Sequence, residues 1–210
     1  MGGHPPSPPN PILERVKGLP RILFAVLALV LAAAFAYSRL SSRSSFSGTV
    51  IEAMPQAPDL ILEGSDGKTH RLSDWNGKVR LVFFAYTHCP DTCPLTLAAL
   101  ARQFEALGEP ADLQIIMITV DPRRDTPARL KQYLARFHHS FVGLTGTPEQ
   151  IARVSSAFYA GYGSGLGEVA QHSDEVRILD KAGRLRAFYN QEKFAREDLY
   201  HDLPQILRWP

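Results

Sequence analysis

The chain has 210 residues, 45% of them hydrophobic, and a formal net charge of +2. That length and apolar content are sufficient for one globular domain with a proper core, plus an extension. Residues 1–43 hold five of the 23 Lys and Arg but one of the 21 Asp and Glu, which leaves a nearly neutral remainder of 18 basic and 20 acidic residues. The absence of a basic stripe argues against nucleic-acid binding.

The amino-terminal segment has the composition of a cytoplasmic tail followed by a membrane anchor. Residues 1–21 are rich in proline and cannot bury a core, so we expect a disordered tail. Residues 22–37 carry no charge, and residues 38–40 extend the stretch towards the roughly 20 residues that span a bilayer. Three basic residues precede it and favour a cytoplasmic amino end. The pattern predicts one transmembrane helix over residues 22–40.

A cleaved signal peptide is the alternative for this segment, because Ala34-Phe35-Ala36 resembles a processing site. Either interpretation exports the rest of the chain, as a polar tether over residues 41–56 and a domain over residues 57–210. The amino terminus is not an Arg- and Ser-rich amphipathic presequence. We therefore favour a bacterial inner membrane over a mitochondrial one, with the domain on the periplasmic side.

The domain opens with the pattern of a hairpin that leads into a buried strand. Residues 58–62 favour a strand, Asp66-Gly67 is a strong turn signal, and residues 69–72 return as the second arm. Residues 81–87 then form a short run of apolar and aromatic side chains. Such a run is typical of a strand that is buried on both faces.

The two cysteines of the chain, Cys89 and Cys93, lie in the loop after this strand and are separated by Pro-Asp-Thr. Helical spacing of apolar residues follows as far as Leu107, and Pro94 suits the first helical position, which leaves Cys93 at or near the N-cap. The positive end of the helix dipole favours a thiolate there over a thiol. Two such thiols side by side can do redox chemistry or bind a soft metal.

Inert packing and a structural disulfide are the simpler interpretations of two cysteines in an exported protein. Neither explains why the pair stands at the carboxyl end of a strand, where open α/β folds place their ligands. The spacing is informative too, because thioredoxin-like redox motifs normally have two residues between the cysteines, and here there are three.

Strands and helices alternate after the cysteine helix. Residues 113–120 and 141–144 have strand composition, Thr126 followed by Pro127 predicts a helix start, and a capping box at residues 147–150 opens the next helix. This alternation predicts an α/β domain whose sheet is rich in parallel pairs and is covered by helices on both faces.

The last part of the domain begins with a glycine-rich stretch, residues 160–171, that has neither an apolar period nor a cap and is expected to be a mobile loop. It leads to His172. Residues 176–179 and 185–189 then predict a second hairpin, and residues 194–207 predict a closing helix that is kinked or restarted near its proline.

Three motifs of the domain are informative together. They are Phe83-Phe84-Ala85-Tyr86-Thr87-His88-Cys89-Pro90-Asp91-Thr92-Cys93-Pro94, Val120-Asp121-Pro122 with Arg124-Asp125-Thr126-Pro127, and His172 ahead of a hairpin. This set resembles the Sco/SenC family, whose members are thioredoxin-fold proteins that carry copper to the CuA centre of cytochrome c oxidase. The resemblance covers about residues 57–207 and agrees with a single amino-terminal anchor and an added amino-terminal hairpin. One position departs from the family pattern, because Gln171 stands where an acidic residue commonly precedes the ligand histidine.

The resemblance implies that Cys89, Cys93 and His172 ligate copper. Two thiolates and one imidazole suit the metal in either oxidation state, since thiolates favour Cu(I) and imidazole helps to hold Cu(II). Structural zinc wants four ligands, and His88 supplies a fourth only if its side chain bends round to the pair. The implied partners are the CuA-containing subunit of cytochrome c oxidase, a periplasmic copper donor, a thiol reductant and the membrane.

Other functions of the same pair stay open. A membrane-tethered thiol-disulfide oxidoreductase needs only the dithiol, although no proline occurs between Pro148 and Pro204 to align a substrate as in thioredoxin-type reductases. A peroxidase of the peroxiredoxin type is disfavoured, because Tyr86 and Pro90 stand where Thr or Ser precedes the reactive cysteine. A redox or copper sensor that acts by docking alone requires the same site.

Overall fold

The computed structural model describes residues 23–33, 46–160 and 175–210. The chain divides into two compact units, Met1–Ser45 and Phe46–Pro210. The second unit therefore begins ahead of residue 57, the domain boundary that the sequence suggested.

In the first unit, residues 23–33 form a helix with exposed side chains. Among the described helices, none combines the length and the apolar character that crossing a bilayer demands. The expected tail over residues 1–21 lies outside the described residues, and so do residues 22 and 34–40 of the expected anchor.

The second unit is built on one mixed sheet in the order β1-β8-β7-β4-β5-β6-β2-β3. Its centre is parallel, since β5 pairs with β4 on one side and with β6 on the other, and the flanking pairs are antiparallel. The strands are β1 (Thr49–Val50), β2 (Leu62–Gly64), β3 (Thr69–His70), β4 (Val79–Ala85), β5 (Leu113–Thr119), β6 (Val142–Thr145), β7 (Val176–Leu179) and β8 (Leu185–Tyr189).

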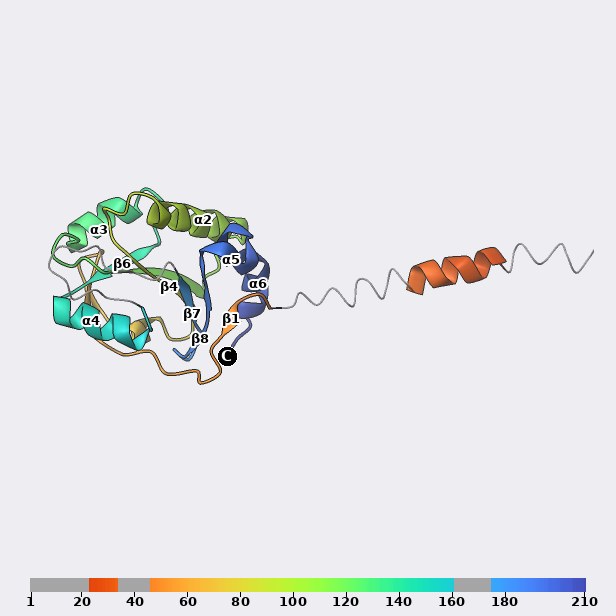
Figure 1. Ribbon diagram of the computed structural model, residues 1–210, viewed down its shortest axis with the longest axis horizontal. Helices are drawn as coiled ribbons and strands as arrows, with labels where there is room; N and C mark the ends of the chain where they lie inside the picture. The colour runs from red at the N-terminus through yellow and green to blue at the C-terminus, as the bar shows by residue number, and fades with distance from the viewer. Residues whose placement is uncertain (1–22, 34–45, 161–174) are drawn as a thin grey trace, which may run out of the picture. The chain divides into compact units, whose positions relative to one another are not determined.

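Helices cover both faces of this sheet, as the sequence predicted. Figure 1 shows α2 and α3 over one face and α4 over the other, with α5 and α6 beside β1 and β8. The helices are η1 (Leu72–Trp75, a 3-10 turn), α2 (Thr92–Ala106), α3 (Pro127–Leu134), α4 (Pro148–Ala157), α5 (Gln191–Ala195) and α6 (Asp198–Ile206).

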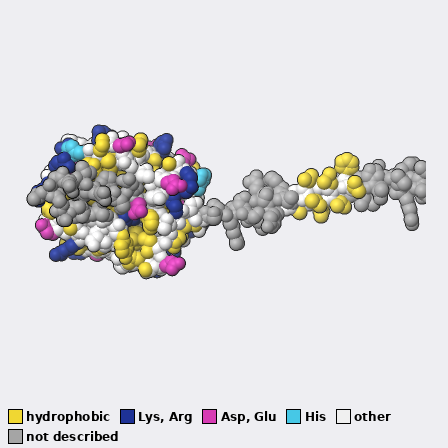
Figure 2. All heavy atoms as spheres, viewed as in Figure 1, with side chains coloured by type: hydrophobic (Ala, Val, Ile, Leu, Met, Phe, Trp, Pro, Cys, Tyr) yellow, Lys and Arg dark blue, Asp and Glu magenta, His cyan; other side chains and the backbone are white. Residues whose placement is uncertain are grey.

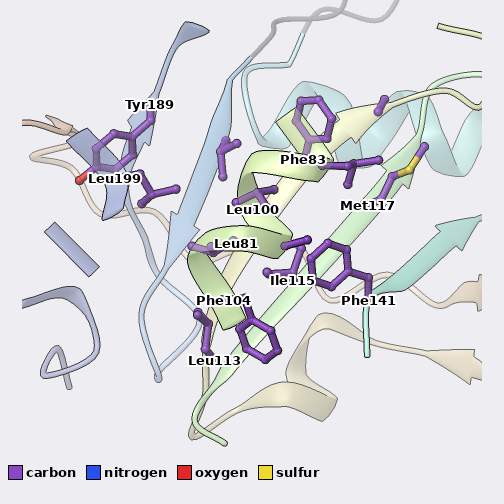
Figure 3. Packing of buried hydrophobic residues seen from close by; sticks show 14 of the residues in the cluster. Leu81, Phe83, Leu100, Phe104, Leu113, Ile115, Met117, Phe141, Tyr189 and Leu199 are labelled. Atoms are coloured by element: carbon purple, nitrogen blue, oxygen red, sulfur yellow. The ribbon is translucent and has the colours of Figure 1, made fainter. Parts of the chain in front are cut away.

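The core consists of two apolar clusters, one on each face, and β4 contributes to both because its side chains alternate. Leu81 and Phe83 point to the cluster under α2, α3 and α6, and Val82 and Phe84 point to the cluster under η1 and α4. Figure 3 shows the first cluster, where side chains of α2 pack onto those of β4 and β5. Burial on both faces explains why the strand reads as a continuous apolar run.

Local signals fixed most element ends, with three differences. Thr126 and Thr147 cap α3 and α4 through their side-chain oxygens, as predicted. The prediction of the first arm of the amino-terminal hairpin over residues 58–62 is wrong, since β2 begins only at Leu62, the last residue of that range. The second arm is shorter than expected, because the chain turns into η1 from Leu72. The closing helix divides into α5 and α6 at Glu197, which adopts a left-handed backbone (φ 60°), and Pro204 lies within α6.

Two buried arginines connect segments that are distant in the sequence by hydrogen bonds to backbone carbonyls. Arg80 of β4 donates hydrogen bonds to the carbonyls of Leu72 and Asp180, at 2.9 and 2.5 Å. Burial lowers the pKa of Arg80, an effect that the nearby Asp180 carboxylate opposes. Because a buried guanidinium is costly without acceptors, these carbonyls fix η1 and the β7–β8 turn to the central strand.

Arg177 of β7 has a comparable role and is 2% exposed. Its guanidinium donates to the carbonyl of Phe158 at 2.7 Å, to that of Tyr159 at 3.2 Å and to that of Glu175 at 3.1 Å. It also pairs with the Glu175 carboxylate at 3.0 Å and lies over the ring of Phe84. One side chain therefore joins the end of α4 to the residue before β7.

The Asp180 carboxylate organises the turn between β7 and β8. It accepts hydrogen bonds from the backbone N–H groups of Ala182 and Arg184, at 3.0 and 2.9 Å, and from the guanidinium groups of Arg184 and Arg186, at 2.9 and 3.1 Å. Burial raises the pKa of Asp180, but these hydrogen bonds lower it further, so its net pKa lies below the usual value.

We expect Asp180→Asn to lower the free energy of unfolding by about 2–3 kcal/mol at pH 7, because a buried charge pair loses one partner. A folded-state pKa below the unfolded value of about 3.9 means that this stabilisation is complete above that pH and is lost as the pH falls. Urea denaturation at several pH values should show that the difference in free energy of unfolding between wild type and variant disappears below about pH 4. Glu192→Gln, which breaks an exposed pair with Arg196, is the control and should change little.

Candidate functional site

The two thiols lie where β4 passes into α2. Cys89 is half-buried in the loop and Cys93 is fully buried in the first turn of the helix, and both are free cysteines. The backbone N–H of Cys93 points at Cys89 Sγ, 3.4 Å away, and the N–H of Cys89 donates to the Tyr86 carbonyl at 3.2 Å. The structure thus brings the two predicted residues together, and an approaching molecule reaches Cys89 first.

The helix begins two residues earlier than the sequence predicted. Asp91 is the N-cap, although its side chain makes no capping hydrogen bond, and Thr92 is the first helical residue. Cys93 is therefore the second residue of α2, and Pro94 is the third rather than the first. The proline is still tolerated, because the N–H groups of a first helical turn have no partner within the helix. Cys93 remains beside the positive end of the helix dipole.

A buried carboxylate holds the cysteine loop in place. Asp125 is 0% exposed and accepts hydrogen bonds from the Thr87 N–H at 3.0 Å, the Thr87 hydroxyl at 2.5 Å and the Thr119 hydroxyl at 2.7 Å. Thr87 precedes the cysteines, and Thr119 ends β5. Because parallel neighbours end at the same sheet edge, one carboxylate can hold both strand ends.

His88 is held by a second set of contacts, to Arg129 and Thr87. Its Nε2 accepts a hydrogen bond from Arg129 Nη2 at 2.7 Å, which assigns the ring proton to Nδ1, and Nδ1 faces the Thr87 hydroxyl at 3.3 Å. Arg129 also donates from Nε to the Thr87 hydroxyl at 3.0 Å. His88 therefore belongs to the loop's support.

A surface pocket of about 410 Å³ opens beside Cys89. The residues around it include Cys89, Pro94, Tyr133, Arg136 and Phe137. Burial, together with the nearby Cys93 and Cys89, raises the pKa of Tyr133 above its usual value. The Tyr133 hydroxyl is buried and has no hydrogen-bond partner among the described residues. The wall of the pocket is mixed, because Thr87, His88 and Arg136 line it together with the apolar residues Pro94 and Phe137.

A second tyrosine stands on the other side of the cysteine loop. Tyr86 is 8% exposed, and burial followed by the proximity of Cys89 and Cys93 raises its pKa. Both tyrosines therefore stay protonated at neutral pH. Neutral hydroxyls around the pair leave the thiols as the soft donors of the site.

The third predicted ligand, His172, and the glycine-rich stretch before it lie outside the described residues. Within the described ranges, no cluster of three or more His, Cys, Asp or Glu side chains has the arrangement of a metal site. The described part of the site is the dithiol and its supports.

Sequence reasoning missed the supporting residues Asp125 and Arg129. Both residues lie beside the helix start predicted at Thr126, which is a local signal and says nothing about the neighbouring strand. A stronger signal was present, because Thr87 follows β4 after one residue and Thr119 ends β5. Parallel pairing of two such strands brings their polar ends together.

Comparison with known proteins gives a consistent result. The family model SCO1/SenC matches residues 56–208. The bovine mitochondrial SCO2 homologue is 35% identical over 158 residues, which cover 70% of this chain and 59% of that protein. The match thus spans well under two thirds of this relative's length.

Solved structures agree with the family match. Bradyrhizobium japonicum ScoI with copper bound is 32% identical, with a TM-score of 0.63 over 73% of this chain and 100% of that one. BsSco, described as a Sco-family cytochrome c oxidase assembly protein with a disulfide switch, is 25% identical, with a TM-score of 0.62 over 72% of this chain and 92% of that one.

The network around Asp125 leads to a testable difference between two aspartates of one loop. We expect Asp125→Ala to lower the free energy of unfolding by about 2–4 kcal/mol, because the Thr87 N–H and the hydroxyls of Thr87 and Thr119 lose a buried acceptor. Asp121→Ala removes a partly exposed ion pair with Arg124 and should cost less than about 1 kcal/mol. Urea denaturation measures both values, and equal costs would contradict the assignment. The alkylation rate of Cys89 should change in the first variant alone.

Proposed function

The chain belongs to the SCO1/SenC family, and we propose that it is a membrane-anchored copper-binding protein that delivers copper to the CuA site of cytochrome c oxidase during assembly. The observation that carries this proposal is the dithiol. Cys89 and Cys93 form no disulfide, lie side by side and stand at the edge where β4 ends. Thiolates bind copper tightly, and a half-exposed thiol can pass it on.

The proposed ligands are Cys89, Cys93 and His172. The described donors fit Cu(I), which prefers soft sulfur, and an added imidazole would extend the set to Cu(II). Both thiols must be reduced and deprotonated to take the metal, so loading depends on redox poise as well as on pH. The buried Cys93 and the half-exposed Cys89 give the site an inner and an outer ligand.

Handover is proposed to proceed by ligand exchange from the outer side. His172 leaves first, a donor from the acceptor protein takes its place, and Cys89 is released before the buried Cys93. Each step replaces one metal–ligand bond by another, so the copper is never released to solvent. The CuA-containing subunit is the proposed acceptor, and a periplasmic copper donor loads the site.

The proposed location is a bacterial inner membrane, with a single pass over residues 22–40 and the domain on the periplasmic side. The charge-free stretch over residues 22–37 and the basic residues before it support this location.

A second function, thiol-disulfide oxidoreductase activity on exported proteins, is favoured by the unequal exposure of the pair. Cys89 can attack a substrate disulfide, which forms a mixed disulfide and releases one substrate thiolate. Cys93 then attacks Cys89 Sγ and releases the second substrate thiolate, so two electrons pass from the pair to the substrate. An external thiol reductant returns the pair to the reduced state. Reduction of the CuA cysteines by this route is compatible with copper delivery.

Copper titration of the full-length chain tests the metal function. The chain is reduced, kept anaerobic in detergent micelles and titrated with Cu(I) in the presence of a competing chelator. We expect one copper per chain, loss of tight binding in Cys89→Ser and in Cys93→Ser, and a weakening of about tenfold or more in His172→Ala.

His201→Ala provides the matched control, because His201 is an exposed histidine on α6. It should retain the wild-type affinity. Wild-type affinity in His172→Ala would remove that residue from the ligand set. The absence of copper binding together with rapid dithiol exchange would support the oxidoreductase function instead.

A further inference from the structure

A basic pocket adjoins the cysteine pocket along α3. Its volume is about 680 Å³, and its lining includes Arg124, Arg129, Gln132 and Arg136. The two pockets share Thr87, Tyr133 and Arg136, so they form one continuous depression that runs from the arginines to Cys89. In Figure 2, dark blue Lys and Arg side chains appear at the upper left, over the end of the molecule where Figure 1 draws α3.

The guanidinium charges of this depression are only partly neutralised. Arg124 pairs with Asp121, but Arg129 and Arg136 have no carboxylate partner among the described residues. Arg129 donates to Thr87 and His88, which are neutral acceptors. Arg136 lies over the ring of Tyr133 and donates to its backbone carbonyl. Two guanidinium groups therefore remain available to a bound molecule.

The nearby carboxylates offset only part of this charge. Asp125 is fully buried, and its hydrogen bonds from Thr87 and Thr119 come from neutral donors, so this carboxylate counts against the arginines. Asp91 is exposed but does not line either pocket. The three arginines of the lining outnumber the carboxylates Asp121 and Asp125, which leaves the pocket wall with a net positive charge.

Tyr133 belongs to the wall that the two pockets share. Its hydroxyl is buried, so the side chain offers a surface ligand its ring and not a hydrogen bond. The Arg136 guanidinium lies over this ring. Guanidinium groups are suited to bind carboxylates, because their N–H donors form a planar fork.

We propose that this depression docks an acidic segment of the protein that exchanges copper or a disulfide with Cys89. This proposal rests on the proposed function, and it adds the surface that selects the partner. Carboxylates of the segment lie against Arg129 and Arg136, and the neighbouring residue bearing the thiol or metal ligand reaches Cys89 past Pro94 and Phe137.

The arrangement has a physical consequence for the rate of exchange. Charges of opposite sign steer the partner to the outer thiol and increase the association rate, and salt screens this effect. The arginines contact the partner's carboxylates, so they alter the rate of encounter and leave the chemistry of the thiols unchanged.

Thiol-disulfide exchange with two synthetic peptides tests the proposal on the full-length reduced chain. Each peptide is a symmetrical disulfide of the same length, with Glu or Asp around the cysteine in one and Gln or Asn in the other. Cys89 attacks the peptide disulfide, and Cys93 completes the exchange, so each turnover oxidises the pair and reduces one peptide disulfide. At low salt we expect the acidic peptide to react about tenfold faster, with the ratio approaching one at about 0.5 M salt.

A charge series at one position isolates the pocket. Arg136→Gln should lower the rate with the acidic peptide about threefold, and Arg136→Glu should lower it about threefold again, with little change for the neutral peptide. The same series at Arg102, an exposed arginine on α2, is the matched control and should have no effect.

Several outcomes overturn the proposal. Equal rates for the two peptides contradict it. An equal response to the Arg102 and Arg136 series also contradicts it, because the overall net charge of the protein would then explain the rates. Inhibition by inorganic phosphate to the same extent in the wild type and in Arg136→Glu also counts against it. Copper titration of the same variants keeps this result separate from the proposed function, because the Arg136 variants should bind copper as the wild type does. If the chain binds no copper but its exchange rate follows the charge at position 136, the proposed copper function is wrong and the docking proposal stands.

Discussion

The site depends on one buried carboxylate. Asp125 joins Thr87, which precedes the cysteines, to Thr119, at the end of β5. Loops at the ends of strands are usually the mobile parts of a fold, and a loop that presents two thiols needs a fixed shape if both are to bind one metal. Arg129 and His88 complete the support from outside. The first turn of α2 and the end of β4 thereby behave as one rigid element.

Rigidity of the loop and inequality of the two thiols have complementary effects. Cys93 is enclosed by the core and stays with the domain, while Cys89 faces the pocket. A site of this kind can retain a metal through its inner ligand while its outer ligand is replaced. The same asymmetry assigns the attacking and the resolving roles in disulfide exchange, so both proposed activities use one geometry. The basic pocket then acts on the choice of partner and not on the chemistry.

The sequence predicted the parts of the fold that local chemistry determines. The apolar runs of β4 and β5, the threonine caps of α3 and α4, and the β7–β8 hairpin were all recognisable before the structure. Prediction failed where a contact with residues far away in the sequence determines the position of an element or the role of a side chain. The first arm of the amino-terminal hairpin lies later than expected, because pairing of β2 with β6 sets its position. The roles of Asp125, Arg129 and Tyr133 also depend on neighbours that are far away in the sequence.

The clamp formed by Arg177 has a consequence for how this protein can vary. Its guanidinium fixes Phe158 and Tyr159 on one side and Glu175 on the other, so one side chain holds the end of α4 to the start of β7. Lysine is no substitute at this position, because an ammonium is a point charge and lacks the planar fork that reaches several carbonyls at once. An exchange that keeps the charge would therefore still release both segments.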